Sequence, residues 1–449
     1  DERAAIEALA GELSDVVAGH AAIDGITTQV AEHWGAVHSG AFFASPSVTF
    51  DSSDVDALLR SLTIRFTPAP GAAKADFNRL SDGQQSLLYI SLVLAMQAIG
   101  RKVLAGEATH FDADKLRPPV YVMIAVEEPE NSLSPQHLGR LLNELTEFSK
   151  NNDAQVTLAT HSPAMLRRVP PEEIRFLRLD GLRRSSVRTI VMPAAADEAS
   201  KYVREAVLAF PELYFARLVV LGEGASEELV LPRVLAAHGL VPDLISVSVA
   251  PLGGRHVNHF WRLLHGLGIP HVTLLDLDAG RNRAGWARLN YAIQQHEAID
   301  PMPGDADEVF TLVKAWDAAE RPDEDSDGKW LIAQLETVGV FFSAPLDLDF
   351  SMLAAFPDAY KVEDAERVAP DDSAVAAVLG KAHAPKELYS EEELKLFEAY
   401  RSRFIKGSKP AAHLAALAEL SDAQLLVGLP PSFKRLALEV ASRLETHPE

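Results

Sequence analysis

The fold of this chain is decided around residues 217–228, RLVVLGEGASEE. Residues 217–221, apolar from Leu218 onward, predict a buried strand, and the two glycines after it permit a tight turn into a helix that begins near Ser226. Glu223 is thereby left at the carboxyl end of the strand, and Glu227, in the first helical turn, can return toward the same place. These residues predict a strand, a turn and a helix that present acidic side chains at one edge of a sheet.

Strands and helices alternate on both sides of this stretch. Expected strands lie at 47–50, 62–66, 120–126, 155–159, 244–250, 272–277 and 339–342, and expected helices at 2–20, 55–59, 84–99, 136–149, 226–237, 256–267 and 330–338. Segments 174–179 and 187–191 are expected to pair as a hairpin that closes the first domain. From about residue 364 onward the pattern is helical. The alternation predicts an α/β fold with a parallel sheet covered by helices.

Two further acidic motifs follow expected strands. Asp276 and Asp278 end strand 272–277, where the alternating period puts both on one side. Asp347 and Asp349 follow strand 339–342 and repeat the pattern, although a plain turn explains this pair about as often. Carboxylate oxygens without His or Cys partners suit a hard cation such as Mg²⁺ or Mn²⁺. Because the chain contains no cysteine, thiolate metal sites and cysteine nucleophiles are excluded.

Another set of motifs lies in the first half of the chain. Residues 81–84, SDGQ, directly precede an expected helix, and a Ser hydroxyl, a glycine and a helix N-terminus can together bind phosphate. Glu127 and Glu128 end an apolar strand, where two carboxylates are costly unless they serve a metal or a water. His161 follows the next strand. Each feature alone is commonly a helix cap or a surface side chain, so their order along the chain carries the signal.

The charge balance limits the kinds of partner. Acidic residues outnumber basic ones by 64 to 42, a net charge of −22 on 449 residues, which argues against holding nucleic acid by a basic surface. It does not exclude a nuclease, because bound divalent cations can reverse the sign of an acidic pocket. The longest apolar stretch, 87–100, is interrupted and falls short of the roughly 18 residues that a membrane span needs. We expect no membrane segment, and the absence of cysteine fits the cytoplasm.

In order and spacing, the first-half motifs resemble the C-terminal half of an ABC-type ATPase head. The resemblance places the signature loop at Ser81, Gly83 and Gln84, the Walker B carboxylate at Glu127, the catalytic glutamate at Glu128, a D-loop at 131–134 and the switch histidine at His161. The chain departs from this pattern in two ways: no Gly-x-x-x-x-Gly-Lys-Ser/Thr occurs in it, and Glu127 replaces the more usual Asp. Because the chain also begins without Met, we expect an N-terminal lobe to be missing. ATP would then bind only together with that lobe, and this chain alone would not hydrolyse it.

Glu223 and the Asp276-x-Asp278 motif, 53 residues apart, resemble the Toprim domain of topoisomerases, bacterial primases and related nucleases. An ABC head followed by a Toprim domain and a helical tail resembles the overcoming-lysogenisation-defect (OLD) family of ATPase-linked nucleases, its class 2 members most closely. The resemblance implies a partial ABC-type ATPase domain over 1–195, a Toprim parallel-sheet domain over 196–360 and a helical domain over 361–449. It also implies a phage-defence endonuclease that acts on DNA and works as a homodimer, because an ABC head pairs signature loop with phosphate loop across a dimer.

The chemistry implied by the resemblance is two-metal hydrolysis of DNA. One Mg²⁺ or Mn²⁺ ion would activate the attacking water and the other would stabilise the leaving oxygen. The implied ligands are Glu223, Glu227, Asp276 and Asp278, with Asp347 or Asp349. A catalytic lysine is implied beyond the third acidic motif, and both Lys381 and Lys409 qualify. We interpret Arg281, Arg283 and Arg288 as a solvated helix face, with contact to phosphate as the alternative.

The main alternative to a nuclease is an ATP-driven DNA clamp or repair scaffold of the structural-maintenance type, which binds DNA without cutting it. A scaffold needs no converging carboxylates, so the three acidic motifs favour catalysis. A topoisomerase is disfavoured, because it needs a tyrosine nucleophile on a DNA-docking module that the sequence does not reveal.

Overall fold

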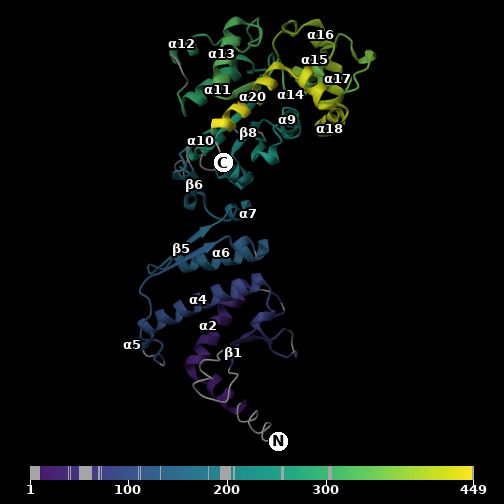
Figure 1. The fold of residues 1–449 in the computed structure, drawn as a ribbon. Coiled ribbons are helices and arrows are strands. Elements are labelled where there is room, and N and C mark those ends of the chain that lie inside the picture. Colours follow the sequence, from purple (N-terminus) through teal and green to yellow (C-terminus); the bar gives the residue numbers. More distant parts are fainter. Residues whose placement is uncertain are drawn as a thin grey trace. The chain divides into compact units, whose positions relative to one another are not determined.

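The computed structural model describes residues 11–38, 40, 42–49, 63–68, 71, 73–109, 111, 113–131, 133–179, 182–192, 204–205, 208–253, 257–301 and 306–446. The chain divides into two compact units, Asp1–Arg168 and Val169–Glu449 (Figure 1). The helix expected at 55–59 and the first part of the helix expected at 2–20 lie outside the described residues.

The first unit combines helices with two small sheets. Its helices are α2 (Ala21–Val37), α4 (Asp82–Leu104), α5 (Ala113–Leu116), α6 (Pro135–Ser149) and α7 (Pro163–Leu166); its strands are β1 (Pro46–Thr49), β2 (Thr63–Phe66), β3 (Ala75–Asp76), β4 (Val122–Glu127) and β5 (Ala154–Ala159). Strands β1 to β3 are antiparallel, whereas β4 and β5 are parallel, with Glu127 opposite Ala159. Helix α2 packs against α4, and α6 packs against β5 (Figure 1). The parallel pair brings the residues after β4 and after β5 to one edge.

Helix α4 is the one described helix that is long and apolar enough to cross a membrane. Of its most apolar window, 56% is buried inside the protein, and Leu87, Leu94 and Ile99 belong to the core. Because the core helix of a soluble protein passes the same test of length and composition, this helix is weak evidence for a membrane span.

A four-stranded parallel sheet forms the centre of the second unit, in the order β11-β10-β8-β9. The strands are β8 (Leu218–Gly222), β9 (Val247–Pro251), β10 (His271–Asp276) and β11 (Val340–Ser343), and the helices between them are α9 (Ala225–Ala237), α10 (Val257–Leu267), α11 (Trp286–Glu297), α12 (Ala306–Thr311) and α13 (Ser326–Thr337). Every residue of β8 and β11 is buried, as expected of parallel strands covered on both faces. The α/β class and the parallel sheet predicted from the sequence are confirmed.

The predicted hairpin forms between β6 (Arg175–Leu179) and β7 (Ser185–Thr189), which pair antiparallel. It belongs to the second unit rather than closing the first, because β7 packs against α10 and the Arg178 guanidinium donates to the Arg217 carbonyl at 3.0 Å.

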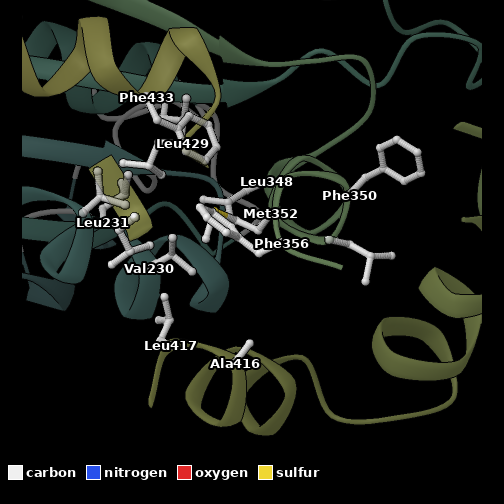
Figure 2. Close-up of a cluster of buried hydrophobic side chains, with 14 of the residues drawn as sticks. Val230, Leu231, Leu348, Phe350, Met352, Phe356, Ala416, Leu417, Leu429 and Phe433 are labelled. Atoms are coloured by element: carbon white, nitrogen blue, oxygen red, sulfur yellow. The ribbon is translucent and has the colours of Figure 1, made fainter. Parts of the chain in front are cut away.

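The helical tail shares one hydrophobic core with the sheet. Its elements are α14 (Leu348–Ala355), α15 (Asp372–Leu379), α16 (Glu391–Leu394), α17 (Phe397–Tyr400), a π-helical turn (Arg401–Ile405), α18 (Lys409–Glu419), α19 (Asp422–Gly428) and α20 (Pro431–Thr446). Figure 2 shows Val230 of α9 among Met352 of α14, Leu417 of α18 and Phe433 of α20. This core fixes α14 and α18 against α9, close to the carboxyl edge of the sheet. The three-domain division at residues 195 and 360 stays a prediction.

Candidate functional site

Six carboxylates gather at the carboxyl edge of the parallel sheet. Glu223 follows β8, and Glu227 lies in the first turn of α9. Asp276 ends β10, and Asp278 follows it with a left-handed backbone (φ 54°). The third motif was expected in a strand exit or a turn, but the structure builds a helix there: Asp347 is the N-cap of α14, accepting from the Phe350 N–H, and Asp349 lies in its first turn. The six carboxylates are those of Glu223, Glu227, Asp276, Asp278, Asp347 and Asp349.

Backbone hydrogen bonds connect the three acidic motifs to one another. The Asp276 N–H donates to Glu223 Oε1 at 3.0 Å, and the Leu348 N–H donates to Asp276 Oδ1 at 3.2 Å. The Gly224 N–H donates to Glu227 Oε2 at 2.6 Å. A Cβ at position 222 would meet the Glu227 Cβ at 2.2 Å, so the strand can turn beneath Glu227 only with glycine there. The three motifs therefore form one site.

Burial and mutual repulsion raise the pKa of several of these carboxyl groups. Burial raises the pKa of Asp276 well above the usual aspartate range, and the charges of Glu223 and Asp347 raise it further. Burial also raises the pKa of Glu223 and of Asp347. The same cause raises the pKa of Glu227 to about 7. Without cations the site is electrostatically unfavourable, which is the property expected of a centre that binds positive charge.

Two arginines after the second motif supply part of that positive charge. Arg288 lies 2.8 Å from Asp278 Oδ2 and 3.4 Å from Glu223 Oε1. Arg281 also pairs with Asp278, and lies 3.3 Å from Asp347 Oδ2. The interpretation of these two arginines as a solvated helix face is therefore wrong. Arg283, by contrast, is exposed.

The two candidate lysines occupy different positions. Lys409, at the start of α18, places its Nζ 2.6 Å from Asp349 Oδ2. Lys381 is exposed, after the end of α15, and shows no ion pair with the cluster within the described residues. The geometry thus brings Lys409, and not Lys381, to the carboxylates.

A buried histidine supports Asp349 from the protein interior. His413 is fully buried, with its Nε2 2.8 Å from Asp349 Oδ1 and its Nδ1 2.6 Å from the Tyr360 hydroxyl. Burial alone would raise the pKa of Asp349, but the hydrogen bond to His413 and the Lys409 charge lower it to about 2. On the neighbouring carboxylate, the Tyr400 hydroxyl donates to Asp347 at 2.5 Å. These supports were not predicted from the sequence, where the local signal for them is the spacing of Lys409 and His413, one helical turn apart.

We predict that His413→Ala lowers the free energy of unfolding of the metal-free protein by about 2–4 kcal/mol, because it leaves a buried carboxylate with one partner fewer. Chemical denaturation measures this difference. His413→Gln is the control, since its amide can still donate to Asp349 and should keep most of the stability. Equal stability of His413→Ala and the wild type would show that the histidine does not support Asp349.

The motifs of the first unit form a separate group. Ser81 caps α4 in a reciprocal capping box with Gln84, and Gly83 is buried in the first turn. Glu127 ends β4, and its neighbour Glu128 has a left-handed backbone (φ 43°). The His161 Nε2 lies 2.5 Å from Glu128 Oε1. The structure thus brings together the residues that the resemblance assigns as catalytic glutamate and switch histidine.

Comparison with known proteins accounts for both regions. The family described as "Overcoming lysogenization defect protein-like, TOPRIM domain" matches residues 214–278. The family described as "AAA domain, putative AbiEii toxin, Type IV TA system" matches residues 30–167. The chain carries an AAA-type ATPase region followed by an OLD-like Toprim domain. The family resemblance seen in the sequence is confirmed at this level, and four of the six carboxylates, those of Glu223, Glu227, Asp276 and Asp278, lie within the residues that match the Toprim family.

Individual relatives are more distant. Endonuclease GajA of Bacillus cereus (strain VD045) is 27% identical over 180 residues, which is 40% of this chain and 30% of that protein. The match therefore spans less than a third of the relative's length. The C-terminal region of the Xanthomonas campestris pv. campestris OLD protein is 19% identical, with a TM-score of 0.32 over 53% of this chain and 100% of that one. The C-terminal region of the Burkholderia pseudomallei OLD protein is 20% identical, with a TM-score of 0.32 over 51% of this chain and 98% of that one.

Proposed function

We propose that this chain is a metal-dependent DNA endonuclease whose acidic cluster holds two divalent cations. The observation that carries the proposal is the convergence of six carboxylates from three separate segments at one sheet edge, where burial and the neighbouring negative charges raise the pKa of Glu223, Glu227 and Asp276. The OLD-like Toprim match and the endonuclease relative support it. A DNA-binding scaffold has no use for such a cluster, because like charges buried together destabilise a protein.

The donor chemistry of the cluster fits a hard cation. All six side chains offer carboxylate oxygens, which Mg²⁺ and Mn²⁺ prefer. In the part of the chain that the structure describes, no three His, Asp or Glu side chains stand ready as a metal-ligand set, and Arg281, Arg288 and Lys409 hold the carboxylates instead. The ligand residues would be Glu223, Glu227, Asp276 and Asp278, with Asp347 or Asp349. Bound cations would supply an activated water and charge stabilisation at the leaving oxygen.

The chain's own groups orient this centre and complement its charge. Tyr400 and His413 hold Asp347 and Asp349 by hydrogen bonds, which fixes the direction of their oxygens. Lys409, half-exposed beside Asp349, can offer its ammonium to the developing negative charge on a phosphate. The chain as a whole carries a net charge of −22, so binding of DNA would depend on these local cations.

Cleavage of supercoiled plasmid tests the proposal. We expect nicked or linear product with Mg²⁺ or Mn²⁺, and none with a chelator. With Ca²⁺ in place of Mg²⁺ or Mn²⁺, we expect the protein to bind DNA without cleaving it rapidly. Absence of product with every metal, at enzyme concentrations that bind the plasmid, would instead favour the DNA clamp or scaffold.

A second expected outcome concerns ATP. The chain contains no Gly-x-x-x-x-Gly-Lys-Ser/Thr loop, so we predict no ATP turnover above that of a Glu128→Gln variant in a phosphate-release assay. The Toprim carboxylates need nothing from a nucleotide site, so nicking should persist without ATP. Strict dependence of cleavage on ATP would show that the two regions do not function separately. Pairing of two ATPase regions would make the active protein a homodimer, which light scattering can check.

A further inference from the structure

Arg288 differs from the other cationic side chains of the acidic site in the groups to which it bonds. It lies in the first turn of α11, and its side chain is 38% exposed. Both of its ion pairs go to carboxylates of the proposed metal site, to Asp278 at 2.8 Å and to Glu223 at 3.4 Å. Its position therefore depends on the same oxygens that a divalent cation would need.

Arg281 is fixed independently of the carboxylates. Its Nε donates to the Val378 carbonyl at 3.1 Å, and another guanidinium nitrogen donates to the Tyr400 hydroxyl at 3.3 Å. These bonds join Arg281 to α15 and α17 whether or not a cation binds nearby. Arg288 shows no comparable anchor among the described residues. Of the two arginines, Arg288 is the one that can leave.

A divalent cation and the Arg288 guanidinium compete for the same oxygens. Both are positive, so a cation bound by Glu223 and Asp278 would repel the guanidinium as well as take its partners. The freed side chain, already half-exposed, can turn toward solvent, where a guanidinium binds phosphate oxygens in a bidentate fashion.

We propose that Arg288 is a resident counter-cation of the acidic site, which a divalent cation displaces and which then binds a phosphate of the DNA. This inference rests on the proposed function, because it needs the cluster to bind a metal. It explains how the metal-free protein tolerates buried carboxylates, and it couples metal binding to capture of the substrate. Loss of Arg288 should therefore have opposite effects on the two ligands: tighter metal binding and weaker DNA binding.

Titration calorimetry with Mn²⁺ alone on the full chain tests whether a divalent cation displaces Arg288. We expect Arg288→Gln to bind Mn²⁺ about tenfold more tightly than the wild type, because the competitor is gone. Arg283→Gln is the matched control: it removes the same charge from an exposed position five residues away, and should bind as the wild type does. Equal or weaker binding by Arg288→Gln would overturn the inference while leaving the metal site in place. No Mn²⁺ binding by any of the three proteins would overturn the proposed function together with the inference.

Two further measurements check that the variant is folded and test whether Arg288 binds a phosphate of the DNA. The metal-free Arg288→Gln protein should melt at a lower temperature than the wild type. Mn²⁺ should remove this difference in melting temperature, which would show that the variant is folded and lacks only the positive charge of Arg288. Fluorescence anisotropy with a duplex in Ca²⁺ should show DNA binding weakened about fivefold in Arg288→Gln and partly kept in Arg288→Lys. Unchanged affinity for the duplex in Arg288→Gln would overturn the phosphate contact.

Discussion

Replacing Asp276 with Asn is expected to lower the rate of plasmid cleavage by at least about a thousandfold, equivalent to about 4 kcal/mol of transition-state stabilisation. Burial and the charges of four neighbouring carboxylates raise the pKa of Asp276, and hydrogen bonds connect this residue to both of the other acidic motifs, so it lies at the centre of the cluster. Removing its charge should leave the melting temperature of the metal-free protein unchanged or higher. Steady-state nicking assays and thermal melts measure the two effects.

The stability difference should depend on pH with a defined sign. Because the folded-state pKa of Asp276 lies above the ordinary value of 3.8, its charge destabilises the fold above that value. The advantage of the Asn variant should therefore shrink as the pH falls toward 3.8, where both proteins are neutral at this position.

Asp325→Asn is a matched control from outside the cluster. Asp325 is also a buried carboxylate, but hydrogen bonds from the Lys314 ammonium and from the Asp327 and Gly328 N–H groups lower its pKa to about 2, so its charge stabilises the fold. Its replacement should lower the melting temperature and leave cleavage intact, the reverse of the Asp276 result. If Asp276→Asn retained full cleavage, the assignment of the acidic edge as the catalytic site would be wrong.

Replacing Lys409 with Met is expected to slow cleavage by about a hundredfold to a thousandfold, because it removes a cation placed beside the cluster for the developing charge on the phosphate. Metal binding by the variant should be kept or strengthened, since Asp349 loses a competing partner. Single-turnover cleavage at saturating Mn²⁺ separates the chemical step from binding.

Lys381→Met provides the comparison for this variant. Lys381 is exposed, and Lys381→Met removes one positive charge from the helical tail, as Lys409→Met does. We expect cleavage within about twofold of the wild type. A large loss in Lys381→Met together with a small one in Lys409→Met would reverse the assignment of the lysine.

The first two acidic motifs could be predicted because their signals are local. Glycines at 222 and 224 determine the turn after β8, and alternation along β10 determines the placement of Asp276. The third motif was predicted with the wrong local structure. Leu348–Ala355 is apolar almost throughout, so its helical period is masked, and only the Asp347 cap marks its start.

The cations and supports of the site could not be predicted, because their partners are distant in sequence. Arg281 and Asp347 are 66 residues apart, and Asp349 and His413 are 64 apart. Such pairs depend on how the tail packs against α9, and no local pattern encodes that packing. Lys381 and Lys409 were equivalent in the sequence for the same reason: only the position of α18 distinguishes them.

In the proposed function, the acidic edge of the Toprim sheet binds the catalytic cations. The most direct test is an anomalous difference map from crystals of the protein soaked in Mn²⁺. We expect two peaks, each within about 2.0–2.6 Å of carboxylate oxygens of Glu223, Asp276, Asp278 and either Asp347 or Asp349, with Arg288 displaced from Asp278. A map without a peak at these oxygens, in crystals that carry Mn²⁺ elsewhere, such as at Glu127 and Glu128, would contradict it.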